Sequence, residues 1–246
     1  MPTPPLRGPA LHQRFSALDA FLIEHQALWR PKPFTHLQLP WESQHRQLAT
    51  WLRARTLAQA EAEHNHPEQL KAPAPFPALA LQARTLSAVG DLPQSPSRTL
   101  PARLSLDVPG RKWQQIEAFA NSLQFRQPTL HWLDWCAGKG HLGRLLAQGG
   151  QSLCCLEFNA ELVDAGQQLS QRNGVQAEHR LQDVLCNSVA NQLKAEHSPV
   201  ALHACGDLHV RLLQLASQVG CQQLAVAPCC YNRIQSDSYQ TISAPA

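Results

Sequence analysis

From residue 111 onward, short apolar runs alternate with amphipathic segments of helical period, and this alternation constrains the fold more than any other feature. Consecutive parallel strands need crossover helices, and right-handed crossovers place helices on both faces of a sheet. We therefore predict an α/β fold with a doubly wound parallel sheet of strand order 3-2-1-4-5. The expected strands are 131–136, 152–158, 179–181, 200–205 and 223–230, and the expected helices are 111–125, 140–148, 160–174, 184–197 and 207–220.

The N-terminal part of the chain has a different character. Apolar residues recur at helical spacing over 15–29 and over 41–64, which predicts two amphipathic helices. The following segment, 71–110, contains seven prolines, so we expect a linker without long helices. The predicted division is a helical region over 1–70, a proline-rich linker over 71–110 and the α/β domain over 111–246.

The chain carries a small positive charge and has no evident targeting segment. The first hundred residues hold ten Lys and Arg against seven Asp and Glu, which permits a polyanionic partner. The N-terminus lacks the basic start and apolar run of a secretory signal, and no stretch has the apolar length of a membrane span. The cysteines lie in strand-like runs rather than at the loop spacings of small secreted domains. We therefore expect reduced thiols and a cytoplasmic protein.

A glycine-rich turn follows the first predicted strand, in the sequence DWCAGKGHLG. Ligands of doubly wound sheets bind beyond the carboxyl ends of the strands, where Gly138 and Gly140 would let the backbone approach closely. Asp134 precedes this turn, and it would repel a dinucleotide diphosphate ~4 to 6 Å away by roughly 3 to 4 kcal/mol at an effective dielectric of about 20. The same carboxylate would attract the ammonium and sulfonium groups of S-adenosylmethionine. The sequence therefore favours S-adenosylmethionine over a dinucleotide.

Two further acids follow the next two predicted strands. Glu157, at the end of the second strand, is placed to accept hydrogen bonds from ribose hydroxyls, a role that it would play equally for NAD. Asp183, after the third strand, is a candidate for binding the adenine amino group. The alternative is that Asp134 and Asp183 cap helices and that Glu157 is a solvated strand end.

Three motifs give the α/β domain a more specific resemblance. They are DWCAGKGHLG at 134–143, HACGDL at 203–208 and PCCYN at 228–232. Together they resemble the class I methyltransferase domain found in the glutathione-S-transferase C-terminal-domain-containing proteins and their bacterial relatives. They are more distantly similar to a tRNA acceptor-stem ribose methyltransferase. The resemblance implies a Rossmann-like sheet that binds S-adenosylmethionine. The implied cofactor-binding residues are Asp134, Cys136, Ala137, Gly138, Lys139, Gly140, Glu157 and Asp183.

The predicted domain departs from this family at its C-terminal end. Methyltransferase sheets usually continue into an antiparallel pair of strands, whereas only residues 233–246 follow here. A five-stranded sheet would leave the strand at 223–230 as an apolar edge, which is an aggregation hazard. We expect either a C-terminally incomplete domain or an edge that the N-terminal region or a partner covers.

Candidate catalytic residues follow the fourth and fifth predicted strands. Methyl transfer from a sulfonium depends mainly on in-line positioning and, for some acceptors, on deprotonation. His203 could be a general base or a satisfied, partly buried side chain. Tyr231 could stack on a base, stack on the adenine or close the core. The sequence lacks the Asp/Asn-Pro-Pro-aromatic motif of amino methyltransferases and the Lys-Asp-Lys-Glu tetrad of ribose methyltransferases, so the acceptor atom stays open. The candidates are His203, Asp207, Tyr231 and Asn232.

Several cysteines are expected at the carboxyl ends of neighbouring strands. With His203, the thiols of Cys136, Cys205, Cys229 and Cys230 could approach a tetrahedral metal shell. Their spacing resembles no known zinc module, and free cysteine is a common small core residue. We therefore expect no metal.

Three functions are compatible with these features. The leading one is an S-adenosylmethionine-dependent methyltransferase acting on RNA, tRNA especially, with Arg53 and Arg55 as phosphate contacts. Such arginines also occur on ordinary solvated helix faces. The second function is a regulatory module that keeps the nucleoside pocket without catalysis. The third is an NAD-dependent oxidoreductase, against which Asp134 argues.

Overall fold

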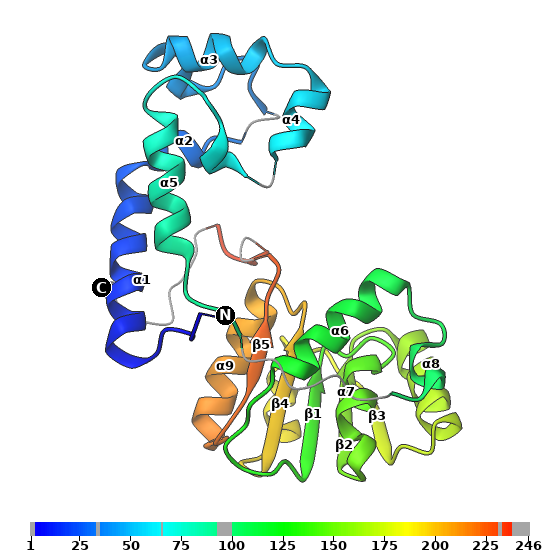
Figure 1. The fold of residues 1–246 in the computed structure, drawn as a ribbon. Coiled ribbons are helices and arrows are strands. Elements are labelled where there is room, and N and C mark those ends of the chain that lie inside the picture. Colours follow the sequence, from blue (N-terminus) through cyan, green and yellow to red (C-terminus); the bar gives the residue numbers. More distant parts are fainter. Residues whose placement is uncertain (1–2, 33–34, 65, 93–99, 231–232, 238–246) are drawn as a thin grey trace. The chain divides into compact units, whose positions relative to one another are not determined.

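The computed structural model describes residues 3–32, 35–64, 66–92, 100–230 and 233–237. These residues group into two compact units that divide after Leu92 (Figure 1). No helix within the described ranges is both long and apolar enough to cross a bilayer.

The first unit is helical, as predicted. Its α-helices are α1 (Gly8–Glu24), α2 (Gln26–Trp29), α3 (Arg46–Arg53), α4 (Leu57–Glu63) and α5 (Phe76–Ser87), and the 3-10 helices are η2 (Pro40–Ser43) and η3 (Pro67–Gln69). The predicted helix at 15–29 is therefore divided between α1 and α2. The small core of this unit includes Phe21, Leu48, Ala49 and Ala80.

The expectation of a linker over the whole of 71–110 is wrong, because α5 lies within it and packs against α1. Pro77 stands in the first turn of α5, where the missing N–H has no helical partner to lose. Arg14 of α1 donates a hydrogen bond to the Thr85 carbonyl at 2.7 Å. The prolines that suggested an irregular segment are thus compatible with a 12-residue helix.

The single helix predicted over 41–64 is also wrong, since the segment forms η2, α3 and α4. Thr56 is in an extended conformation and caps α4: its hydroxyl accepts the Gln59 N–H at 3.3 Å, while the Gln59 side chain accepts the Thr56 N–H at 2.9 Å. This reciprocal capping box satisfies backbone donors that a continuous helix would have bonded internally.

The second unit contains the predicted parallel sheet. Its strands are β1 (His131–Trp135), β2 (Ser152–Glu157), β3 (Ala177–Leu181), β4 (His197–Leu202) and β5 (Ala225–Ala227). They pair in the order β3-β2-β1-β4-β5, which confirms the predicted topology. In register, Asp134 of β1 lies between Cys155 of β2 and Val200 of β4.

Helices cover both faces of this sheet (Figure 1). Alternation along β1 sends Trp132 to a core shared with α6 (Gly110–Ser122) and α7 (His141–Leu146). It sends Leu133 and Trp135 to a core shared with α9 (Asp207–Val219). Helix α8 (Ala160–Arg172) packs on β2 and β3. The doubly wound architecture is therefore present, with β1 in its centre.

Two predicted elements of this unit differ in the structure. The helix expected at 184–197 is replaced by the 3-10 helix η6 (Asn187–Gln192), after which β4 begins. Asn and Ser residues in this segment favour local side-chain bonds over a continuing helix. The expected strand at 223–230 is confined to β5, because Pro228 has no N–H to donate to a ladder. β5 lies at the edge of the described sheet.

Thr56→Ala removes the side-chain acceptor of the α4 cap. We expect the first unit to lose about 1 kcal/mol of stability, which is the usual cost of an N-cap substitution. Urea unfolding followed by circular dichroism measures this loss. Thr50→Ala is the control, because Thr50 is exposed within α3, where alanine has the higher helix propensity. Equal effects of the two substitutions would contradict a stabilising cap.

Candidate functional site

The glycine turn begins directly after β1. Cys136, Gly138 and Gly140 have φ angles of 56°, 57° and 71°, so the turn uses the left-handed region three times. The Gly140 N–H donates to the Ala137 carbonyl at 2.8 Å, and the Ala137 N–H donates to Leu156 of β2 at 3.0 Å. Cys136 holds a conformation that costs a non-glycine residue about 1–2 kcal/mol. The turn is therefore a tightly bonded segment with some backbone strain at its first residue.

The sequence predicted that Asp134 faces a ligand at the mouth of this turn. In the structure its side chain is buried instead. The residue is 2% exposed, and its Oδ2 accepts the Gly143 N–H of α7 at 2.8 Å. Desolvation raises the pKa of Asp134 to about 7, although the Gly143 hydrogen bond and the charge of Arg144 oppose this rise. The structure thus matches the helix-capping alternative. A carboxylate beneath the helix, partly protonated near neutral pH, does not select a ligand by direct contact.

The carboxylate that contacts this turn belongs to Glu157. One of its carboxylate oxygens accepts the Gly138 N–H at 2.8 Å, and the other accepts the Asn159 N–H at 2.9 Å. The Gly138 N–H could otherwise bind a phosphate oxygen, since glycine turns of this type present N–H groups to anions. Here that donor is already occupied by a carboxylate. The carboxylate bonded to this turn is therefore that of Glu157, whereas Asp134 is bonded to α7.

A cavity of about 380 Å³ lies at the carboxyl ends of β1, β2 and β3. Its size is within the range of small-molecule sites. Phe158 is 73% exposed beside Glu157, which gives the cavity an aromatic surface next to a carboxylate. The lining residues are Cys136, Leu156, Glu157, Phe158, Gln182, Asp183, Val184, Leu185 and Leu208.

The structure therefore brings three predicted binding residues, Cys136, Glu157 and Asp183, to one cavity. Asp183 accepts the Leu185 N–H at 2.9 Å, so it also fixes the turn after β3. Burial and the charge of Glu157 raise the pKa of Cys136 to about 12, so its thiol is neutral. Sequence analysis missed Phe158, although an aromatic residue directly after the acidic end of a strand is a visible signal.

A buried polar layer supports the turn from below, and the sequence analysis did not identify it. Arg144 is 1% exposed, and its guanidinium donates to the Lys139 carbonyl and to Nδ1 of His141, the latter at 2.9 Å. Desolvation and the charge of Arg144 lower the pKa of His141 to about 3, so this imidazole is neutral and can accept. Lys139, one of the predicted binding residues, thus contacts this buried layer through its backbone carbonyl, which accepts from Arg144.

Of the four predicted catalytic residues, the structure describes His203 and Asp207. His203 lies just after β4 with a φ of 66°, is exposed, and its Nε2 is 3.1 Å from Oε1 of Gln115. Asp207 begins α9 and accepts the Gln235 N–H at 2.7 Å, so its carboxylate holds the segment after β5. Tyr231 and Asn232 lie outside the described residues. Roles in acceptor positioning therefore stay predictions for these four residues.

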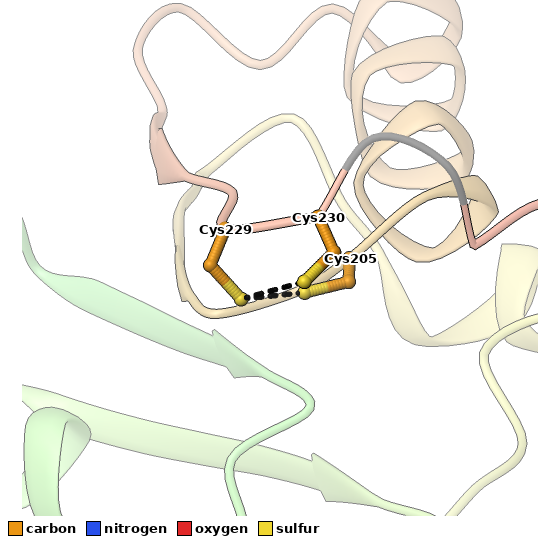
Figure 2. Close-up of side chains that lie close together, drawn as sticks. All are labelled: Cys205, Cys229 and Cys230. Carbon is orange, nitrogen blue, oxygen red and sulfur yellow. Dashed lines mark hydrogen bonds between the residues drawn. The ribbon is translucent and has the colours of Figure 1, made fainter. Parts of the chain in front are cut away.

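Three of the five residues considered for a metal shell form a cluster of free thiols. Figure 2 shows Cys205, Cys229 and Cys230 facing one another, with Sγ atoms all within 4.8 Å. Cys136 and His203 are not members of this group. Burial opposes ionisation of Cys205, but hydrogen bonds from the neighbouring thiols hold its pKa below the ordinary value. The hydrogen bonds with Cys205 and Cys230 raise the pKa of Cys229 to about 12.

Arg53 and Arg55 are engaged within the first unit. Arg53 pairs with Glu42 at 2.7 Å and also donates to the Leu37 carbonyl at 2.8 Å. Arg55 pairs with Glu63 and lies 4.4 Å above the Trp51 ring. Each guanidinium group is therefore paired with one glutamate of the same unit. Their role as phosphate contacts stays a prediction.

Gly140→Ala should destabilise the second unit by roughly 3 kcal/mol, which combines left-handed strain with overpacking. A Cβ at Gly140 would lie 2.6 Å from Cε1 of His179 and 3.0 Å from Sγ of Cys155. Gly150→Ala is a matched control, since Gly150 has a φ of 88° but no atom within 4 Å of its Cβ position. We expect it to lose only about 1 kcal/mol. Chemical denaturation distinguishes the two, and equal losses would refute the packing of the turn on His179.

Asp134→Asn should change how stability depends on pH. Between about pH 4 and pH 7 the folded protein binds a proton at Asp134 that the unfolded chain has released, so the wild type loses stability as pH rises. The advantage of the Asn variant over the wild type should therefore grow from about pH 4 to about pH 7 and then level off. Measuring both proteins cancels the opposite contributions of His141 and His179, whose pKa values burial lowers. A pH-independent difference would contradict a raised pKa at Asp134.

The comparisons with known proteins place this geometry in a family. The family model described as a methyltransferase domain matches residues 111–237. No curated protein gives a significant match. One similar solved structure is that of magnesium protoporphyrin IX methyltransferase ChlM from Synechocystis PCC 6803 with bound S-adenosylhomocysteine. It is 19% identical, with a TM-score of 0.34, and the match covers 40% of this chain and 46% of that one.

Two further structures were found. The Pyrococcus abyssi tRNA (uracil-54, C5)-methyltransferase is 23% identical, with a TM-score of 0.32 and coverage of 38% of this chain and 22% of that one. The bifunctional kinase-methyltransferase WbdD is 22% identical, with a TM-score of 0.31 and coverage of 37% of this chain and 22% of that one. The chain thus spans between about a fifth and a half of the length of these three proteins. Because the family model matches more than half of the residues and coincides with the described sheet, the chain belongs to the methyltransferase domain family.

Proposed function

We propose that this methyltransferase uses S-adenosylmethionine as its methyl donor and binds the nucleoside part in the cavity beside Glu157. The observation that carries the proposal is the combination of a glycine turn, a carboxylate bonded to that turn and an exposed aromatic ring in one cavity. S-adenosylmethionine supplies an activated methyl group on a sulfonium.

The residues of the cavity fit a nucleoside without a diphosphate. Each oxygen of Glu157 accepts one backbone N–H, and a carboxylate has further lone pairs for ribose hydroxyls. Phe158 offers an apolar surface to a purine, and Asp183 can accept from an amino group. Glu157 could serve NAD equally, and the oxidoreductase alternative is the weaker one because the matching family model is that of a methyltransferase domain.

We propose RNA as the acceptor class to be tested first. Its support is the excess of three positive charges in the first hundred residues. Arg53 and Arg55 do not add to this support, because both are paired with glutamates. The remaining cations of that region would have to provide the phosphate contacts.

Incubation of the full chain with methyl-labelled S-adenosylmethionine and separated RNA, protein and small-molecule fractions tests the activity. We expect label in the RNA fraction, with protein and metabolites as the competing acceptors. Binding of S-adenosylhomocysteine without transfer to any fraction would instead favour the regulatory module. Binding of NADH in place of S-adenosylhomocysteine would refute the proposed donor.

Glu157→Gln should weaken S-adenosylhomocysteine binding about tenfold to a hundredfold, since a hydrogen bond to a charged group contributes about 1.5–3 kcal/mol. Isothermal titration calorimetry measures this change. Glu161→Gln is the matched control, because Glu161 is an acid in the first turn of α8 outside the lining of the cavity. A thermal unfolding curve for each variant separates lost binding from lost folding. Equal affinities of the two variants would argue against the assigned role of Glu157.

A further inference from the structure

The thiols of Cys205, Cys229 and Cys230 converge from two loops that follow neighbouring strands (Figure 2). Cys205 lies between β4 and α9, and the other two cysteines follow β5. The Sγ atoms of Cys205 and Cys229 are 2.8 Å apart, and those of Cys229 and Cys230 are 3.6 Å apart. Cys205 is buried, whereas Cys229 is exposed, so the group opens to solvent on one side.

The backbone around these thiols holds the two loops together. The Gly206 N–H donates to the Cys230 carbonyl at 2.7 Å, and the Asp207 N–H donates to the Arg233 carbonyl at 3.2 Å. A Cβ on Gly206 would lie 1.7 Å from that Arg233 oxygen, so only glycine allows this approach. The Asp207 carboxylate closes the arrangement by accepting the Gln235 N–H at 2.7 Å. The cysteines are therefore positioned by contacts that do not involve their own sulfur atoms.

The spacing of the sulfur atoms suits a tetrahedral metal centre. Zinc–sulfur bonds of about 2.3 Å at tetrahedral angles separate two sulfur ligands by about 3.8 Å. The Cys229–Cys230 separation of 3.6 Å is close to this value, and Cys205 must move about 1 Å away from Cys229 to reach it. Three thiolates without a cation would repel one another, whereas a soft divalent ion would neutralise them.

We propose that Cys205, Cys229 and Cys230 bind one zinc ion. Among the residues that the structure describes, this group has three ligand atoms, which leaves a fourth position for water or an exogenous ligand. Each coordinating thiol releases its proton to solvent when the metal binds, and no electron is transferred. This geometry leads us to revise the expectation of no metal, which rested on sequence spacing and on the frequency of free cysteine in protein cores. The inference goes beyond the proposed methyl transfer and does not depend on it.

The full chain, purified under reducing conditions and reconstituted with zinc, tests the site. We expect about one equivalent of zinc by elemental analysis after removal of free metal. We also expect a sulfur-to-metal charge-transfer band of three-thiolate intensity when cobalt replaces zinc. Cys229→Ser and Cys230→Ser should each weaken zinc binding at least tenfold in a competition with a chromophoric chelator.

Cys186→Ser is the matched control, since Cys186 is an exposed thiol outside the cluster, and it should retain the wild-type zinc affinity. Because Cys205 is buried, the decisive variants are those of Cys229 and Cys230, and their thermal unfolding without metal should match the wild type. The proposal is overturned if reconstituted protein holds less than a tenth of an equivalent. It is also overturned if the cluster variants bind zinc as tightly as Cys186→Ser does, or if mass spectrometry of the reduced preparation shows a Cys205–Cys229 disulfide instead.

Discussion

The hydrogen bond from the Gly138 N–H to the Glu157 carboxylate is the contact on which the organisation of the binding cavity depends. It joins the turn after β1 to the end of β2, and the second oxygen of the same carboxylate fixes the start of the β2–α8 connection. A charged acceptor between two backbone donors makes both bonds stronger than neutral ones. The cavity is therefore assembled around an acid.

Beneath the turn, the polar groups are buried and have structural roles. Asp134 accepts the Gly143 N–H, and Arg144 donates to the Lys139 carbonyl and to a neutral His141. Gly140 can approach this layer because it has no side chain to collide with His179. Burial costs these groups solvation, so their hydrogen bonds to one another are needed to keep the turn in place. The acid that is most visible in the sequence motif thus supports the site from the interior.

The same parallel topology creates a second chemical group at the ends of β4 and β5. Carboxyl ends of neighbouring parallel strands share one edge of the sheet, so loops that are distant in sequence meet there. Cys205 and Cys229 become neighbours in this way, and the backbone bonds of Gly206 and Asp207 set their separation. The metal site and the nucleoside cavity that we propose therefore have a common architectural origin, although they use different strands.

The sequence by itself determined the sheet, because strand and helix periods depend on residues close together in the chain. The alternation of strands with helices was predictable on that basis, as was the place of Glu157 at the end of β2, and the strand order followed from the doubly wound fold that this alternation indicates. The segment 41–64 is divided because Thr56 and Gln59 cap a new helix. The pattern of apolar residues does not reveal this pair of hydrogen bonds. Only the tertiary structure decided which acid faces the cavity. A carboxylate turns toward N–H groups that have no other partner, and these can lie far away in the sequence. In the folded chain Asp134 accepts the buried Gly143 N–H, and Glu157 accepts the Gly138 N–H at the turn.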